Sequence, residues 1–297
     1  MPGRRRGRIA AIAAGIIGLS IWLAALWWGI RSPAFLENWP VANLGFEPWQ
    51  PLSPGIDYAR AAFTSPRPYK CHAVRIDLTD PRIAVGVPRG PHDGNNMATA
   101  QLPTSWLRRH HLTLAINATP FFPYQILPGT RTRLQGLSIS AGEQWAEPVP
   151  NLDAFVLRPD GRPDLVAAQA DLGRVTEGVG GFLIVLRHGQ PTHEEIEADA
   201  AVFIGYSADA HWLYCLVVDG GQPGYSEGVM PSEGALLMQQ LGASDALRMD
   251  GGGSATLVAA GGWTGARLLN RPRSPGYAGI CRPIGNVLGV RLRSTPR

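Results

Sequence analysis

Two short stretches of the chain end in the same way, and one predicted helix lies between them. Residues 216–221 read Leu-Val-Val-Asp-Gly-Gly, and residues 247–253 read Leu-Arg-Met-Asp-Gly-Gly-Gly. The apolar pattern of residues 231–241, followed by glycine, predicts the helix. A strand–helix–strand unit normally yields parallel strands whose carboxyl ends share one edge of a sheet. We therefore expect Asp219 and Asp250 to face one crevice, on strands that are adjacent or separated by a third.

The glycines after the second aspartate have their own physical interpretation. Gly251, Gly252 and Gly253 lack a Cβ atom, so a ligand can approach the backbone closely. Successive exposed N–H groups can also form an anion-binding concavity. Ser254 and Thr256 add hydroxyl donors just beyond. The alternative is that Asp-Gly-Gly marks only a turn, which the occurrence of two copies around one helix makes less attractive.

Two further polar residues allow two interpretations each. Glu233 lies at the start of the predicted helix, where it could act in the site or complement the helix dipole. Asn117 follows the apolar stretch 112–116 and precedes Phe121 and Phe122. It could bind a sugar hydroxyl while the rings stack on the sugar, or it could form a turn. Paired carboxylates are the groups that act as acid, base or nucleophile on a sugar centre.

Motifs for cofactors and metals are missing from the sequence. It contains no Gly-x-x-x-x-Gly-Lys-[Ser/Thr] loop. The residues after the glycine triplet resemble a strand, whereas a dinucleotide fingerprint requires a helix there. The seven histidines show no His-Glu-x-x-His spacing. We therefore expect no cofactor and no metal ion.

The apolar and polar pattern beyond residue 71 predicts many short strands and few helices. This balance indicates an α+β fold with mixed β-sheets, in a single domain over residues 71–297. Residues 32–70 are rich in proline, which suggests a tether without regular structure.

The basic charge of the chain is concentrated at its N-terminus. Residues 1–31 contain five arginines and no acid, whereas the remaining 22 basic and 23 acidic side chains balance to −1. A nucleic-acid partner is therefore not expected. Residues 9–30 carry no charge and are long enough to cross a bilayer. Their bulky end, with Trp27 and Trp28, favours an uncleaved anchor over a signal peptide.

The distribution of arginines also sets the orientation of this anchor. Arginines before the apolar segment stay in the cytoplasm by the positive-inside rule. We therefore expect a single-pass protein of the inner (cytoplasmic) membrane, with residues 1–31 as basic tip and transmembrane helix. The domain at 71–297 would then be extracytoplasmic, in the periplasm.

The three cysteines cannot all pair with one another. Cys215 lies in an apolar stretch typical of a buried strand. A Cys71–Cys281 disulfide is possible in an oxidising compartment, and the sequence leaves it open.

Three blocks of the sequence resemble the phosphodiester glycosidase family. The most specific is residues 214–258, with both Asp-Gly-Gly pieces. Residues 115–122 are similar to the strand of the family that ends in Asn and paired aromatics, and residues 282–290 to its closing Arg…Asn strand. The resemblance extends over about residues 70–293. It implies a hydrolase that cleaves a glycosyl-1-phosphodiester bond in an envelope or extracellular glycan, such as an exopolysaccharide.

The resemblance also implies roles for individual residues. Asp219 and Asp250 would be catalytic, with Glu233 as a third candidate. The substrate-binding group would comprise Asn117, Gly251, Gly252, Gly253, Ser254, Thr256, Arg282 and Asn286.

Some positions depart from the pattern of the family. An Arg-Thr pair is usual before the first Asp-Gly, and the matching positions are Ala201 and Val202. The family often has Arg at Gly221 and Asn at Arg248. A lost arginine removes a charge-assisted contact to phosphate or sugar, for which Arg131, Arg133 or Arg282 could compensate. Two alternatives therefore stay open: a glycan-binding or exopolysaccharide-associated protein without turnover, and an ordinary glycosidase.

Overall fold

The computed structural model describes residues 45–92, 95–192, 197–274 and 277–293, and most of their regular structure is β-sheet. The predicted anchor at 9–30 lies outside these residues. Within the described ranges, no helix is long and apolar enough to cross a membrane. The expectation of many strands and few helices is confirmed.

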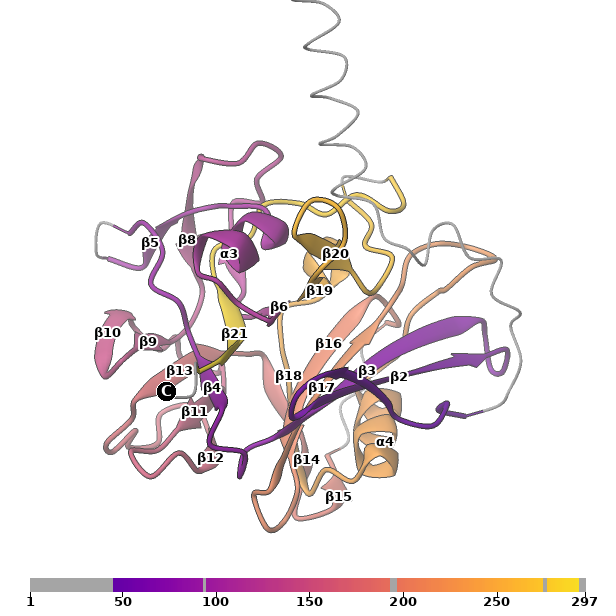
Figure 1. Ribbon diagram of the computed structural model, residues 1–297, viewed down its shortest axis with the longest axis horizontal. Coiled ribbons are helices and arrows are strands. Elements are labelled where there is room, and N and C mark those ends of the chain that lie inside the picture. The colour runs from indigo at the N-terminus through magenta and orange to yellow at the C-terminus, as the bar shows by residue number, and fades with distance from the viewer. Residues whose placement is uncertain (1–44, 93–94, 193–196, 275–276, 294–297) are drawn as a thin grey trace, which may run out of the picture.

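An eight-stranded sheet forms the centre of the molecule (Figure 1). In spatial order its strands are β1 (Gln50–Ser53), β2 (Ile56–Phe63), β3 (Tyr69–Asp77), β17 (Trp212–Val218), β16 (Ala201–Tyr206), β18 (Asp245–Arg248), β14 (Leu183–Arg187) and β15 (Gln190–Pro191).

Among the described residues, three smaller sheets lie to the left of it and above it in the view of Figure 1. The first comprises β20 (Ala266–Leu268), β19 (Leu257–Ala260), β6 (Leu114–Asn117), β21 (Val287–Leu292) and β4 (Ile83–Gly86). The second comprises β10 (Glu143–Ala146), β9 (Ser138–Ser140), β13 (Glu177–Gly180), β11 (Ala154–Leu157) and β12 (Pro163–Val166). The third comprises β5 (Met97–Thr99), β8 (Arg131–Leu134) and β7 (Phe121–Phe122). The helical elements are α3 (Pro103–Arg109), α4 (Pro231–Leu241) and the short 3₁₀ turn η1 (Gly252–Ser254).

Two of the expectations about this architecture are wrong. The sheets are not mixed, because every ladder between described strands is antiparallel. The proline-rich tether expected over residues 32–70 does not extend through its second half, since β1, β2 and the start of β3 belong to the central sheet. Prolines 51, 54, 66 and 68 are accommodated at the sheet edge and in the connections between these strands.

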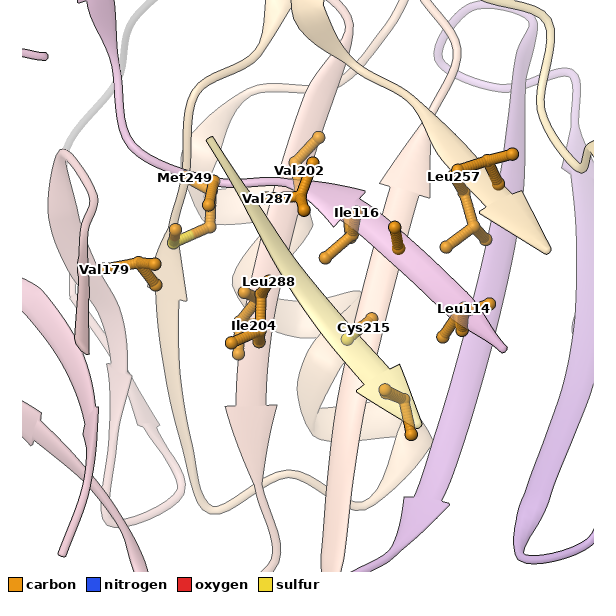
Figure 2. Packing of buried hydrophobic residues seen from close by; sticks show 14 of the residues in the cluster. Leu114, Ile116, Val179, Val202, Ile204, Cys215, Met249, Leu257, Val287 and Leu288 are labelled. Carbon is orange, nitrogen blue, oxygen red and sulfur yellow. The ribbon is translucent and has the colours of Figure 1, made fainter. Parts of the chain in front are cut away.

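The core has two layers because the side chains of the central strands alternate between two faces. On β16, Val202 and Ile204 point into a cluster shared with β6, β19 and β21, and Figure 2 shows them among Ile116, Val287 and Leu288. Ala201 and Phe203 on the same strand point into the other cluster, which α4 covers. Buried hydrophobic surface on both faces therefore holds the central strands, and with them the strand ends, in place.

The cysteines are all buried and free. Cys215 is the buried strand thiol expected from the sequence. The Cys71–Cys281 disulfide that the sequence left open is not formed. Burial raises the pKa of both thiols, and for Cys71 the nearby Asp219 adds to this effect. Both thiols therefore stay protonated at neutral pH.

Candidate active site

Asp219 and Asp250 lie at the same edge of the central sheet. β17 and β18 both pair with β16 in antiparallel register, so they run parallel to each other with β16 between them. Each aspartate lies at the carboxyl end of its strand region. The prediction of a shared edge is thus confirmed, and the intervening strand separates the two strands by about 10 Å. The prediction that both aspartates face one crevice is not, because neither of them lines the cavity found at this edge.

The carboxylate of Asp219 is enclosed by partners on every side. Its Oδ1 accepts hydrogen bonds from Asn270 Nδ2 and from the Arg271 backbone N–H, both at 3.0 Å. Its Oδ2 accepts one from the Tyr225 hydroxyl at 3.3 Å and faces His72 Nε2 at the same distance. The side chain is fully buried. Asp219 therefore joins β17 to the segment that follows β20 and leaves no oxygen for a ligand.

A second layer of contacts supports this enclosed carboxylate. The Tyr58 hydroxyl lies 2.7 Å from His72 Nδ1 and orients the imidazole. Burial, and then the charge of Asp219, raise the pKa of Tyr225, so its hydroxyl keeps the proton that it donates. These partners come from β2, β3 and two loops, and sequence reasoning missed all of them. Asn270 alone had a recognisable signal, because it ends an apolar stretch as Asn117 does.

Asp250 has a different environment. It is 4% exposed, and burial raises its pKa from 3.8 to about 6. The Ser254 hydroxyl, the charge of Arg282 and the Gly251 N–H act in the opposite direction and stabilise the ionised form. Because these opposing effects leave the pKa close to neutral pH, Asp250 can both lose and regain a proton there.

Arg282 lies between Ser254, which hydrogen-bonds to Asp250, and a cavity that opens to solvent. Its Nε and Nη2 donate to Ser254 Oγ at 3.0 and 2.7 Å, and its guanidinium stacks 4.1 Å from the centre of the Tyr124 ring. Burial lowers the pKa of Arg282, and the negative charges of Asp250 and Asp199 counteract this. Asp199 is a partly buried carboxylate that sequence reasoning did not identify.

A small cavity of about 160 Å³ opens beside this group. Its lining residues are Tyr124, Gln125, Ile126, Gly253, Arg273, Ser274 and Arg282. Larger hollows exist elsewhere. No carboxylate lines the two near α3, and the one beside β4 and β21, which Glu177 lines, contains no residue of the Asp250 loop. The cavity beside Arg282 borders the Asp250 loop at Gly253, and two guanidinium groups, those of Arg273 and Arg282, line it. We therefore take it as the candidate active site.

The glycine triplet has a packing role. A Cβ atom on Gly251 would lie 2.6 Å from the carbonyl oxygen of Ala200, and Gly252 has a φ of +54°. The N–H of Gly252 donates to Ala200 O, and that of Ser254 donates to Gly251 O. The expected anion concavity is therefore largely occupied by internal hydrogen bonds. Gly253 alone of the three lines the cavity.

Asn117 and Asn286 were predicted to bind substrate, but their side chains form hydrogen bonds to the backbone of neighbouring segments. Asn117 donates to the Asp250 carbonyl at 2.6 Å and accepts from the Thr256 N–H at 2.9 Å. Asn286 accepts from the Thr119 N–H at 2.9 Å and donates to Ser138 Oγ. All of these side chains are buried, including that of Thr256. They hold the Asp250 loop and β6 in place, and they do not reach the cavity.

Glu233 belongs to a helix cap. Its Oε2 accepts from the Met230 N–H at 2.8 Å at the start of α4 and forms an ion pair with Arg67. No contact of the described residues links it to Asp250 or Arg282. This position matches the helix-terminal interpretation of Glu233 and gives no support to the catalytic one, which stays a prediction.

The guanidinium of Arg273 lies beside Gly221, the position at which the family often has an arginine. A Cβ atom on Gly221 would lie 2.5 Å from Arg273 Cζ, and Arg273 Nη1 donates to the Gly221 carbonyl at 2.6 Å. Arg282 also lines the cavity, whereas Arg131 and Arg133 lie exposed on β8 and do not. Of the arginines considered from the sequence, only Arg282 is placed to compensate.

The chain matches known proteins at the level of family and fold. A model of the phosphodiester glycosidase family matches residues 111–291. None of the curated proteins matches it. The catalytic domain of zebrafish N-acetylglucosamine-1-phosphodiester alpha-N-acetylglucosaminidase, auto-inhibited by its pro-peptide, is 19% identical with a TM-score of 0.62. That match covers 89% of this chain and 92% of the other. A hypothetical protein from Synechocystis is 15% identical with a TM-score of 0.57, over 83% of this chain and 64% of the other.

Proposed function

The chain belongs to the phosphodiester glycosidase family, and from this premise we propose that it hydrolyses a glycosyl-1-phosphodiester bond. The family and the fold are those of a hydrolase. The zebrafish protein of similar fold is named for a sugar-1-phosphodiester, which suggests the class of bond. The observation that carries the proposal is the group of Asp250, Ser254 and Arg282 beside a cavity that a second arginine also lines.

The arginines of the cavity suit a phosphodiester. Guanidinium groups donate paired hydrogen bonds to phosphate oxygens and stay charged at all working pH values. Arg273 and Arg282 line the cavity with Gly253, whose missing Cβ lets the Arg273 carbonyl and the Arg282 guanidinium approach its backbone closely. We assign phosphate binding to these three residues.

The carboxylates of the site have different roles: two of them transfer protons, and one positions a neighbouring segment. With a pKa of about 6, Asp250 can donate a proton to the phosphate oxygen as the bond from C1 to oxygen breaks. Asp199, which is partly exposed near Arg282, would deprotonate the water that adds to C1. Asp219 acts as a positioning residue, because its enclosed carboxylate holds the segment leading to Arg273.

A product assay tests this function. The full-length protein would be incubated with a panel of glycosyl phosphodiesters, and the released phosphomonoester would be measured. Asp250→Asn should lower kcat by roughly 100- to 10,000-fold, as expected for loss of a general acid. Asp160→Asn, in an exposed turn, is the matched control and should leave kcat unchanged. Full activity of the Asp250→Asn protein would contradict the assignment.

A glycan-binding protein without turnover is the second candidate. Ala201 and Val202, which replace the usual Arg-Thr pair, are fully packed in β16 and offer no polar contact. Glycan binding without product from any diester would favour this candidate. Release of the free sugar from a glycosidic bond without phosphate would instead indicate an ordinary glycosidase.

The location of the protein is also a proposal. The uncharged residues 9–30, preceded by four arginines, support a single inner-membrane anchor with the domain in the periplasm, acting on an envelope glycan. Protease added to spheroplasts should then digest the domain, and protection of the domain would argue against this topology.

A further inference from the structure

A second polar hollow lies on the other side of the loop that borders the cavity. We call it the α3 hollow: about 630 Å³, lined by Thr99, Gln101, Ser105, Arg108 and Arg109, with Pro91, Pro128 and Gly129. Figure 1 shows α3, which carries three of these side chains, near β5 and β8. None of its lining side chains is acidic, so it offers mainly hydrogen-bond donors and positive charge.

The two arginines of the α3 hollow are available to a ligand. Both are exposed, and among the described residues neither forms an ion pair with a carboxylate. Arg108 donates to the Thr264 carbonyl at 3.3 Å, and Arg109 donates to Gln101 Oε1 at 3.1 Å. These neutral contacts orient the guanidinium groups and leave their charges uncompensated.

Unsatisfied polar atoms are also concentrated here. Gln101 is 8% exposed, and its Nε2 has no partner in the protein. A neighbouring hollow of about 500 Å³ shares Pro91 and Arg109, and two of its residues, His92 and His110, each carry a buried ring nitrogen without a partner. Buried polar groups without partners are rare in proteins and often mark a place where a water, an ion or a ligand binds.

The loop from Tyr124 to Gly129 joins this hollow to the catalytic cavity. Its first part, at Tyr124, Gln125 and Ile126, lines the cavity, and its end, at Pro128 and Gly129, lines the α3 hollow. An extended glycan that crosses this loop would reach both places. A ligand with repeated acidic groups fits this pair of arginine-lined hollows better than a single sugar phosphate does.

We propose that the α3 hollow is a subsite for a phosphorylated sugar unit of the glycan, away from the bond that is cleaved. Arg108 and Arg109 would bind the phosphate, and Thr99, Gln101 and Ser105 would bind sugar hydroxyl groups. The identity of this glycan as the substrate rests on the proposed function, whereas the binding itself does not. The substrate would then be a chain of several phosphorylated units.

Binding to phosphorylated dextran tests the subsite without any need for turnover. Full-length protein in detergent would be immobilised and exposed to phosphorylated dextran and to neutral dextran. We expect tighter binding of the phosphorylated form, and a loss of roughly ten-fold in the double variant Arg108→Gln/Arg109→Gln. The double variant Arg162→Gln/Arg174→Gln, at exposed arginines in the connections before β12 and β13, is the matched control and should bind normally.

The outcomes separate this inference from the proposed function. Equal binding of the two dextrans, or normal binding by the Arg108/Arg109 variant, would overturn the subsite. Weaker binding with unchanged kcat/KM on a single-link diester would support it. Weaker binding in a protein that cleaves no diester would support the subsite and refute the proposed function.

A second variant is needed if the Arg108→Gln/Arg109→Gln protein unfolds at a lower temperature than the natural protein. Ser105→Asp then provides the test, because a carboxylate there should repel the phosphorylated dextran.

Discussion

Replacing Asp250 with asparagine should stabilise the protein at neutral pH while it lowers kcat. The folded state holds the proton of Asp250 up to a pKa of about 6, whereas the unfolded chain releases it near 3.8. The folded state therefore binds more protons between these values, and its stability falls as the pH rises through them. Asparagine has nearly the same shape and cannot ionise, so it avoids this loss.

The size of the effect follows from the two pKa values. Each unit of difference between the folded and unfolded pKa of Asp250 corresponds to about 1.4 kcal/mol. Ionisation of Asp250 therefore lowers the free energy of unfolding by about 3 kcal/mol above pH 7 and by almost nothing below pH 4. For a domain of this size, 1 kcal/mol shifts Tm by roughly 2–4 °C. The Asp250→Asn protein should thus melt roughly 6–12 °C above the natural protein at pH 7.5 and at nearly the same temperature at pH 4.

Thermal melting followed by tryptophan fluorescence provides the measurement, since the chain contains nine tryptophans. Both proteins would be melted at half-unit steps from pH 4 to 8. Asp160→Asn is the matched control, and its Tm should follow that of the natural protein throughout. A Tm difference that does not change with pH would refute the reasoning, because it would show that ionisation of Asp250 costs nothing in the folded state.

Three other substitutions test the roles of groups around the site. Glu233→Gln should keep the capping hydrogen bond, lose at most about 1 kcal/mol with the ion pair, and leave kcat unchanged. Asn270→Ala should destabilise the protein by about 3 kcal/mol, because Asp219 and two backbone groups lose a buried partner. Gly251→Ala should lose about 2–3 kcal/mol and most activity, since the added Cβ would collide with the Ala200 carbonyl.

Urea unfolding and single-link kinetics measure all three. A 100-fold fall in kcat for Glu233→Gln would restore it as a catalytic candidate. Unchanged stability of Asn270→Ala would mean that water replaces the lost amide. Gly261→Ala, where φ is +123° and no atom lies near the added Cβ, is the control for activity: backbone strain should lower its stability, but it should retain full activity.

Part of this structure follows from local pattern alone. The helix at 231–241 has the predicted bounds, and the apolar stretches before Asp219 and Asp250 form the expected strands β17 and β18. Each is a short apolar stretch of clear period with glycine, proline or polar residues at its ends, so the local signal and the packing agree. β1 and β2 were missed because the prolines in and around them suggested a tether, and the pairing of β1 with β2 and of β2 with β3 overrides that local preference.

The sequence alone determined that the two Asp-Gly-Gly pieces end on one edge of a sheet and that the chain belongs with phosphodiester glycosidases. Both conclusions depend on patterns along the chain. The family follows from its motifs, and the shared edge follows because a strand–helix–strand unit places the ends of its two strands on the same side of a sheet. Only the tertiary structure separated the enclosed Asp219 from Asp250, placed Glu233 in a helix cap and brought Arg273 to the position facing Gly221. The physical reason is that burial, pKa and hydrogen-bond partners depend on segments far apart in the sequence, whose contacts no local pattern records.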